Sequence, residues 1–298
     1  MSRVAVPAAD MAQDYGSQDM VSRLRRVLVR RPDEAFGGAD PAVWHYTARP
    51  RLRAAQREHD AFVALLEKDG IEVLRHDAPQ LGRADSIFVH DPVIVTDGGA
   101  VLLRMGKELR REEEESIGKR LDELGVPVLA RLRGRATAEG GDLLWLDHDT
   151  LAVGQGFRTN VEGLRQLRGV LREVGARTLP VPLPYFQGPE ACLHLMSLIS
   201  LLDLDLAVVH APLLPMPFWH ELRDRGIDLV EVPEAEFATM ATNVLAVAPR
   251  DCVALRGNPR TKARLEEAGC RVRTYAGDEI SLKAEGGPTC LTRPMLRR

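Results

Sequence analysis

Residues 143–181, LLWLDHDTLAVGQGFRTNVEGLRQLRGVLREVGARTLPV, contain two short apolar runs, a helical stretch, a glycine and a further apolar run, in that order. The first two runs, Leu143–Leu146 and Thr150–Val153, have the length and composition of short strands. The helical stretch runs from Val161 to Val174 and stops at Gly175, a residue type that commonly closes a helix in the left-handed conformation. These residues therefore predict a unit of strand, strand, helix and strand.

The same order of elements recurs elsewhere in the chain. Helical stretches also stop at Gly70, Gly125, Gly226 and Gly269, and the five glycines lie 55, 50, 51 and 43 residues apart. Pairs of strand-like runs precede the later helices: Ser86–Val95 with Ala100–Arg104, Leu193–Leu202 with Leu206–Val209, and Thr242–Val247 with Cys252–Leu255. A unit repeated at a near-fixed period favours a closed ring of modules over a doubly wound sheet. The alternative is that ordinary βα elements recur at similar lengths by coincidence.

We therefore predict an α/β protein built as a five-fold pseudosymmetric propeller. The first strand-like run is Leu24–Pro32, and the small, polar residues 1–20 predict a flexible N-terminal tail. Residues 21–298 are expected to form a single catalytic domain. A chain of 298 residues with 45% hydrophobic content can bury a large core, although its length alone is also compatible with two domains.

Composition argues against several classes of partner. A formal net charge of −3 provides no basic surface for nucleic acid or an anionic membrane. The most apolar stretch, residues 191–209, contains His194, Asp203 and Asp205, so no segment is expected to cross a bilayer. The four cysteines have neither disulfide-framework nor metal-site spacing, and the N-terminus has no secretory pattern. We expect a cytoplasmic protein with a small polar substrate, no metal and no cofactor.

The residues that suggest chemistry lie close to the C-terminus. In Glu285-Gly286-Gly287-Pro288-Thr289-Cys290, two glycines and a proline predict a tight bend that presents the thiol of Cys290. The alternative is that Cys290 is a small buried core residue. Three upstream motifs favour a nucleophile because they supply a possible base and two carboxylates. They are Phe88-Val89-His90-Asp91, Glu139-Gly140-Gly141-Asp142 and Cys192-Leu193-His194-Leu195.

These motifs, with Gly154-Gln155-Gly156-Phe157-Arg158-Thr159-Asn160, resemble the guanidino-group modifying (pentein) superfamily. The similarity is greatest to the dimethylarginine dimethylaminohydrolases, whose relatives are the arginine deiminases and amidinotransferases, and it covers residues 23–294. The resemblance implies that Cys290 attacks the guanidinium carbon, that His194 is the general acid and base, and that Glu139 orients His194 and stabilises its charged form. Each role suits the residue type, although a histidine among apolar residues and a Glu-Gly-Gly-Asp turn are also common structural features.

The resemblance also implies a set of substrate contacts. Asp91 would hold the guanidinium through paired hydrogen bonds, and Asp85 would serve the amino-acid end of the substrate. Arg111 and Arg158 match positions that contact the substrate carboxylate, with the register of Arg111 against Arg110 left open. A solvated arginine is the alternative in both cases. Three further residues are candidates for the substrate pocket: His90, Ser197 and Glu285.

Two departures from the family patterns bear on the substrate. Arginine deiminases carry an aspartate where this chain has Met196, which favours the dimethylarginine hydrolase pattern. His90 stands where those hydrolases tend to have an acidic residue, which favours a differently substituted guanidine. We expect a hydrolase that converts arginine or an Nω-substituted arginine into citrulline and an amine through a covalent thiouronium on Cys290. The alternatives are an arginine deiminase, an amidinotransferase or a non-catalytic binding protein of this fold. A homodimer is possible.

Overall fold

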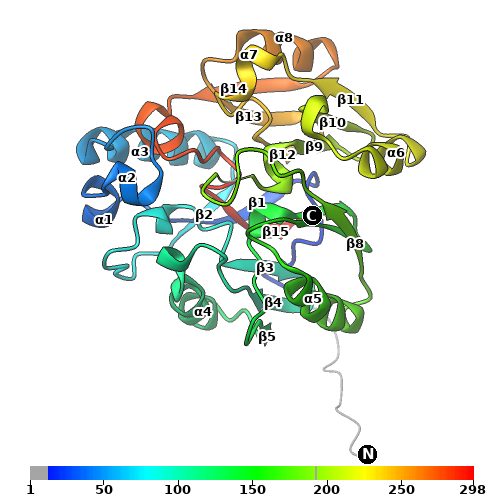
Figure 1. Ribbon diagram of the computed structural model, residues 1–298. Helices are drawn as coiled ribbons and strands as arrows, with labels where there is room; N and C mark the ends of the chain where they lie inside the picture. Colours follow the sequence, from blue (N-terminus) through cyan, green and yellow to red (C-terminus); the bar gives the residue numbers. More distant parts are fainter. Residues whose placement is uncertain (1–12, 192) are drawn as a thin grey trace, which may run out of the picture.

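The computed structural model describes residues 13–191 and 193–298, and their strands form five sheets of three strands each. The sheets stand around a common axis, with the longer helices at the periphery (Figure 1). In every sheet the middle strand pairs antiparallel with one neighbour and parallel with the other. The predicted ring of five repeated α/β units is therefore confirmed.

Four sheets are each built from one continuous segment. In chain order they contain β3 (Val93–Thr96), β4 (Gly99–Leu102) and β5 (Val128–Arg131); β6 (Leu143–Asp147), β7 (Thr150–Gln155) and β8 (Arg177–Pro182); β9 (Ile199–Asp203), β10 (Leu206–Val209) and β11 (Asp228–Glu231); and β12 (Val244–Ala248), β13 (Asp251–Leu255) and β14 (Arg271–Tyr275).

The remaining sheet joins the two ends of the chain. Its middle strand is β1 (Leu24–Val29), which pairs parallel with β2 (Glu72–Arg75) and antiparallel with β15 (Arg293–Arg297). The C-terminal strand thus completes the N-terminal unit and closes the ring. Residues 13–20 pack here as well, because the amide of Gly16 donates to the carbonyl of Met295 and the side chain of Gln18 is buried. The predicted tail therefore does not extend over residues 13–20, and residues 1–12 lie outside the described part.

The helix between the second and third strands of each unit ends where the sequence predicts. These helices are α3 (Leu52–Lys68), α4 (Glu113–Glu123), α5 (Val161–Glu173), α6 (Met216–Asp224) and α8 (Pro259–Glu267). All five predicted stop glycines have positive φ, between 71° and 87°. Short helices α1 (Glu34–Gly37), α2 (Pro41–Trp44) and α7 (Glu234–Phe237) lie in connections.

Each long helix buries an apolar face on its own sheet. In α5, for example, Leu164, Leu167 and Leu171 pack with Trp145 and Val153 of β6 and β7. The spacing of three and four residues places these leucines on one face of the helix. The polar side of the helix remains in solvent, so the units present their helices outward and their loops to the axis.

Two predicted strands start later than their apolar sequence suggests. Residues 84–87 and 195–197 form 3₁₀ turns, and the strands begin only at Val93 and Ile199. The turns hold His90, Asp91 and His194 in irregular backbone ahead of the sheets, so strand alternation does not govern where these side chains point. Composition could not separate such turns from strands because the predicted runs 86–95 and 193–202 contain mostly apolar residues, as short buried strands do.

Candidate active site

A narrow cavity lies where the loops of the five units converge. Its lining combines residues that are far apart in sequence, among them Trp44, Asp91, Arg158, His194 and Cys290. Closing the ring between β1 and β15 brings these segments together, because the side chains precede or follow strands of four different units. All three predicted catalytic residues are at or directly behind this cavity.

The thiol of Cys290 is held by a bend whose glycines leave no room for side chains. Asn243 donates a hydrogen bond from Nδ2 to Sγ of Cys290 at 3.3 Å, and its Oδ1 accepts from the amide of Thr289 at 3.0 Å. A Cβ on Gly287 would lie 2.4 Å from Cγ of Asn243, and one on Gly286 would lie 2.2 Å from the ring of Phe88. Burial, followed by the charge of Asp91, raises the pKa of Cys290 to about 11. The thiol is therefore protonated in the unliganded protein near neutral pH.

His194 and Glu139 form a buried ion pair beside the thiol. Nε2 of His194 lies 2.7 Å from Oε2 of Glu139, and the Glu139 side chain is fully buried. The other oxygen of Glu139 accepts from the amides of Gly106 and Lys107 at 2.9 and 3.0 Å. Burial would raise the pKa of Glu139, but the hydrogen bond to His194 and the charge of Arg158 outweigh burial and lower it well below the usual value. Glu139 is thus a fixed negative charge that favours the protonated imidazole.

The loop that carries His194 depends on close backbone packing. A Cβ on Gly141 would lie 2.4 Å from Nδ1 of His194, so the imidazole rests directly on the main chain of the Glu-Gly-Gly-Asp motif. Oγ of Ser197 accepts from the amide of His194 at 3.1 Å, and Asp142 accepts from the amide of Leu195 at 2.9 Å. Ser197 therefore shapes this loop, and it is not among the residues that line the cavity. Cys192 lies outside the described residues.

Asp91 faces the cavity from a buried network. Its Oδ1 accepts from the amide of Gly141 at 2.9 Å, and its Oδ2 accepts from Nη1 of Arg110 at 2.6 Å. Arg110 also donates to both oxygens of Glu113, another buried carboxylate. Burial would raise the pKa of Asp91, but Arg110 and then His194 lower it. The carboxylate is therefore ionised and available to a cationic ligand.

Of the two adjacent arginines, the structure places Arg110 in the cavity and Arg111 at the surface. The side chain of Arg110 is 4% exposed and that of Arg111 is 38% exposed, with Arg111 paired to Glu108 at 3.2 Å. A 3₁₀ turn over residues 108–110 ahead of α4 sets this register. Arg158 lines the cavity, with Nη1 3.3 Å from Oε2 of Glu139.

Asp85 and Glu285 line the cavity, whereas His90 does not. Asp85 accepts from the hydroxyl of Tyr46 and the ammonium of Lys107, both at 2.6 Å. Glu285 is exposed at the mouth, with φ of 57°. The imidazole of His90 is buried behind Asp91, with Nδ1 2.9 Å from the carbonyl of Thr292, and burial lowers its pKa to about 3. His90 is therefore an uncharged core residue.

Sequence reasoning missed Tyr46, Lys107 and Asn243 as part of the site. None of them lies in a motif that suggests chemistry. Lys107 lines the cavity, whereas Tyr46 and Asn243 contact the lining residues Asp85 and Cys290, and all three lie in connections whose conformation depends on tertiary packing. For Arg110 the clue was present, since two adjacent arginines left the register open. Only the turn before α4 shows which of the two points inward.

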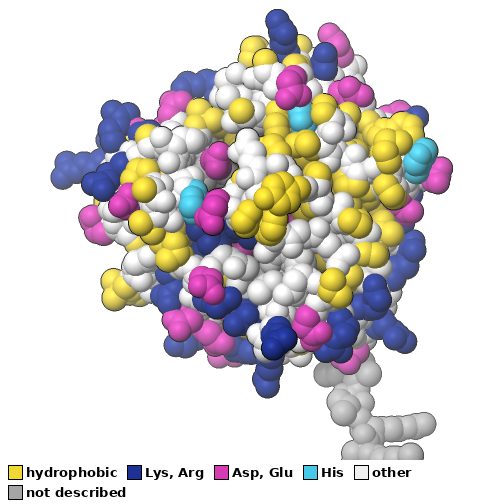
Figure 2. All heavy atoms as spheres, viewed as in Figure 1, with side chains coloured by type: hydrophobic (Ala, Val, Ile, Leu, Met, Phe, Trp, Pro, Cys, Tyr) yellow, Lys and Arg dark blue, Asp and Glu magenta, His cyan; other side chains and the backbone are white. Residues whose placement is uncertain are grey.

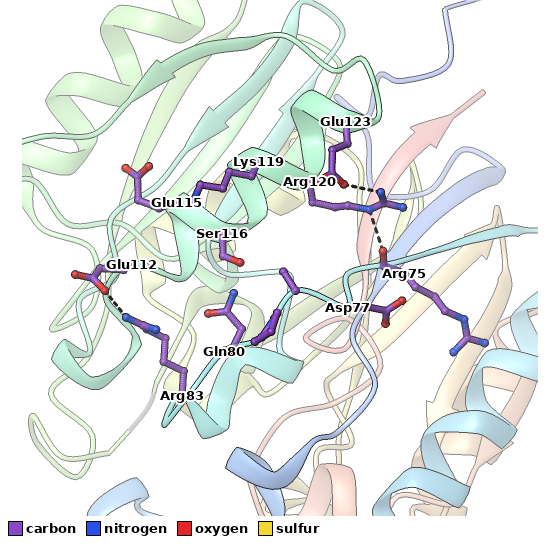
Figure 3. Close-up of a pocket in the computed structure, with 12 residues that line it drawn as sticks. Arg75, Asp77, Gln80, Arg83, Glu112, Glu115, Ser116, Lys119, Arg120 and Glu123 are labelled. Atoms are coloured by element: carbon purple, nitrogen blue, oxygen red, sulfur yellow. Dashed lines mark hydrogen bonds and ion pairs between the residues drawn. The ribbon is translucent and has the colours of Figure 1, made fainter.

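A wider hollow of about 740 Å³ lies between α4 and the segment after β2, away from this chemistry (Figure 3). Its lining mixes cations and anions, which include the pairs Arg83–Glu112 and Arg120–Glu123. Acidic and basic side chains are also interspersed over the face of the molecule in Figure 2. A surface with mixed charges has no large region of positive electrostatic potential that would attract a polyanion.

Residues 13–191 and 193–298 contain no cluster of three or more His, Cys, Asp or Glu side chains that could hold a metal ion. Within the same ranges we find no helix with the length and apolar character that a bilayer crossing requires.

Comparisons with known proteins show which proteins the chain resembles. The family described as N,N dimethylarginine dimethylhydrolase, eukaryotic, matches residues 46–297. The N(G),N(G)-dimethylarginine dimethylaminohydrolase of Streptomyces coelicolor is 34% identical, over 90% of this chain and 96% of its own length. An arginine deiminase of Mycobacterium bovis is 30% identical, over 96% of this chain and 99% of its own.

Solved structures show the same fold. A cysteine-to-serine mutant of the dimethylarginine dimethylaminohydrolase from Pseudomonas aeruginosa, complexed with citrulline, superposes with a TM-score of 0.78 at 25% identity. The alignment covers 91% of this chain and 99% of that one. The N-terminal domain of ArgZ, covalently bound to a reaction intermediate, superposes with a TM-score of 0.79 at 21% identity. This alignment covers 91% of this chain and 98% of that one, and at this identity it supports the fold alone.

Proposed function

Because the chain belongs to the dimethylarginine dimethylaminohydrolase family and is a hydrolase acting on guanidino groups, we propose that it acts on arginine or an Nω-substituted arginine. The products are citrulline and an amine, and the intermediate is a thiouronium on Cys290. The observation that carries this proposal is that Cys290, the His194–Glu139 ion pair and Asp91 meet in one cavity. A nucleophile, an acid and base, and a counter-charge for a guanidinium are the groups that this reaction requires.

Binding of the substrate activates the nucleophile. The guanidinium lies against Asp91, whose negative charge raises the pKa of Cys290 in the unliganded protein. The positive charge of the bound guanidinium offsets the charge of Asp91. Because the guanidinium also lies next to the sulfur, it stabilises the thiolate and lowers the pKa of the thiol. The thiol therefore loses its proton to solvent when the electrophile is in place.

The first half-reaction exchanges a C–N bond for a C–S bond. The thiolate attacks the central carbon of the guanidinium, and His194 donates its proton to the departing nitrogen, so the leaving group departs as a neutral amine. Glu139 stabilises the protonated imidazole before this transfer. What remains is the cationic thiouronium on Cys290, held by Asp91.

The second half-reaction releases the ureido product. Water takes the place of the amine and gives a proton to the neutral His194 as its oxygen bonds to the central carbon. The C–S bond then breaks, its electron pair returns to sulfur, and the remaining hydroxyl proton of the adduct passes to the sulfur, so the product leaves as a neutral ureido compound. The imidazolium and the thiol of the resting enzyme are regenerated, and no cofactor enters the cycle.

Purified protein incubated with arginine, monomethylarginine, asymmetric dimethylarginine, N-hydroxyarginine and agmatine tests the proposal, with the ureido product as the readout. We expect turnover of at least one substituted arginine and loss of activity by about a thousandfold or more in Cys290→Ser. Cys270→Ser, at the cysteine directly before β14, is the matched control and keeps activity. Absence of product across the whole panel would refute the proposed hydrolase.

A second candidate is hydrolysis of unsubstituted arginine, which the 30% identity to an arginine deiminase favours. Against it, the position two residues after His194 holds the buried, apolar Met196, which supplies no second carboxylate to the guanidinium. Arginine in the substrate panel separates the two, because a deiminase turns over arginine faster than its methylated forms.

A further inference from the structure

The carboxylate of Asp85 already has a partner on each oxygen. The hydroxyl of Tyr46 donates to Oδ1, and the ammonium of Lys107 donates to Oδ2, both at 2.6 Å. The side chains of Asp85 and Lys107 are only 8% and 13% exposed. Burial and the charge of Asp85 raise the pKa of Tyr46, so its hydroxyl remains a donor. Asp85 is therefore a neutralised carboxylate and not a free anion.

Lys107 is held at this position from three sides. Besides Asp85, its ammonium donates to the carbonyl of Trp44 at 3.0 Å and lies 4.8 Å from the centre of the Trp44 ring. Its own amide donates to Glu139, the partner of His194. These contacts fix the ammonium group in the wall of the cavity. The main-chain amide of Lys107 is bonded to the catalytic carboxylate of Glu139, and its ammonium group is bonded to Trp44, the last residue of α2.

The pair lies toward the mouth of the cavity. Cys290 and Asp91 mark the reacting end, and the exposed side chains of His45 and Glu285 mark the opening. Lys107 contacts Trp44, the neighbour of His45, and its charge opposes the rise that burial imposes on the pKa of Glu285. A substrate whose guanidino group reaches Cys290 must therefore extend its other end past Lys107.

We propose that Lys107 is a specificity-determining residue that makes the α-ammonium group of the substrate dispensable. An α-ammonium can reach Asp85 only by displacing Lys107, whose charge would then lie nearby without its partner, so the new pair adds little to binding. The substrate class therefore extends from arginine derivatives to ω-guanidino carboxylates that lack the α-amino group. This inference rests on the proposed function of the same site.

The test compares two substrates that differ only at the α-carbon: Nω-methylarginine and 5-(N'-methylguanidino)pentanoate. The readout is the ratio of their kcat/KM values in the wild type, in Lys107→Met and in Lys119→Met. Methionine matches the lysine side chain as far as Cε and keeps the hydrogen bond from the main-chain amide to Glu139, but it removes the cation. Lys119, on the exposed side of α4, provides a lysine-to-methionine control away from the cavity.

We expect the two kcat/KM values of the wild type to lie within about tenfold of each other. In Lys107→Met the ratio should move at least tenfold toward the α-amino compound, because Asp85 is then a buried charge that only a substrate ammonium can pair. Lys119→Met should leave the ratio unchanged.

An equal ratio in all three proteins, with turnover of both compounds, overturns the role of Lys107 and leaves the proposed function intact. No turnover of either compound by any protein overturns this inference, whereas the proposed function fails only if the whole substrate panel gives no product. If Lys107→Met does not fold, the wild type alone decides, since a preference of more than about tenfold for the α-amino compound refutes the inference. Lys107→Arg, which retains the charge, must then keep the wild-type ratio.

Discussion

The reactivity of Cys290 depends on its immediate surroundings. Burial and the charge of Asp91 raise the pKa of its thiol to about 11, whereas His194 and the hydrogen bond from Asn243 act in the opposite direction. The unliganded protein therefore holds a protonated nucleophile, and a guanidinium ligand supplies the missing positive charge. This arrangement restricts the reactive thiolate to the loaded site.

The pH dependence of thiol alkylation follows from this. The thiolate fraction rises with pH through the pKa, so the rate of alkylation of Cys290 should increase about tenfold per pH unit between pH 7 and 10 with no plateau. A small, saturating guanidinium ligand that leaves the sulfur accessible should lower the pKa of the thiol, so that the alkylation rate reaches a plateau within this pH range. Asn243→Ala removes a hydrogen bond that lowers the pKa of the thiol, so it should shift the pH profile to higher pH. Iodoacetamide labelling followed by mass spectrometry measures the rate, with Cys290→Ser as background. A plateau below pH 9 in the unliganded protein would contradict the prediction.

Two adjacent arginines should respond very differently to the same substitution. Arg110→Met leaves Asp91 and Glu113 buried without their cation, which should cost about 3–5 kcal/mol of the free energy of unfolding. Arg111→Met removes an exposed pair with Glu108 and should cost less than about 1 kcal/mol. Urea denaturation measures both variants. Similar losses in the two variants would show that the register of this turn is misplaced.

At the scale of elements, α5 shows which local sequence signals define the helix of the repeated unit. Its apolar spacing, the side chain of Asn160 that accepts from the amide of Gly163, and the terminal Gly175 all agree with the helix that forms. Local preferences and tertiary packing point to the same structure here, which is why the helix boundaries could be read closely from the sequence.

Two glycines of this helical segment should respond with opposite sign to alanine. Gly169 is exposed in the helix and a Cβ there meets nothing within 4 Å, so Gly169→Ala should stabilise the protein by about 0.5–1 kcal/mol. Gly175 has φ of 79°, so Gly175→Ala should destabilise it by about 1–2 kcal/mol. Thermal unfolding of the two variants against the wild type measures the difference. Shifts of the same sign would refute this account of the helix end.

At the scale of the molecule, the ring depends on a strand from the opposite end of the chain. Without β15, strand β1 loses an antiparallel partner, and the buried Met295 and Arg297 leave the interior. The sequence immediately before β15 also carries Cys290, so closure of the ring and assembly of the site are the same structural event.

Truncation before Arg293 should therefore abolish cooperative folding, since the loss of β15 and its buried side chains exceeds the few kcal/mol by which domains are stable. Circular dichroism and urea denaturation measure this, and removal of Arg298 alone is the control that should unfold cooperatively. A truncated protein that still unfolds in one sharp transition would show that closure by β15 is dispensable.

The sequence by itself determined the five units, their helix ends and the residues of the catalytic motifs. Helical periodicity and the glycines that end helices are properties of short segments, so they can be recognised without knowledge of the rest of the chain. Tertiary structure alone decided that Arg110 and not Arg111 enters the cavity, that Asn243 contacts Cys290 and that Lys107 neutralises Asp85. Asn243 precedes β12 and Cys290 precedes β15, so their contact requires two units in place. The contacts of Lys107 and Arg110 join the connections before β3 and after β4, which meet only when that unit is folded.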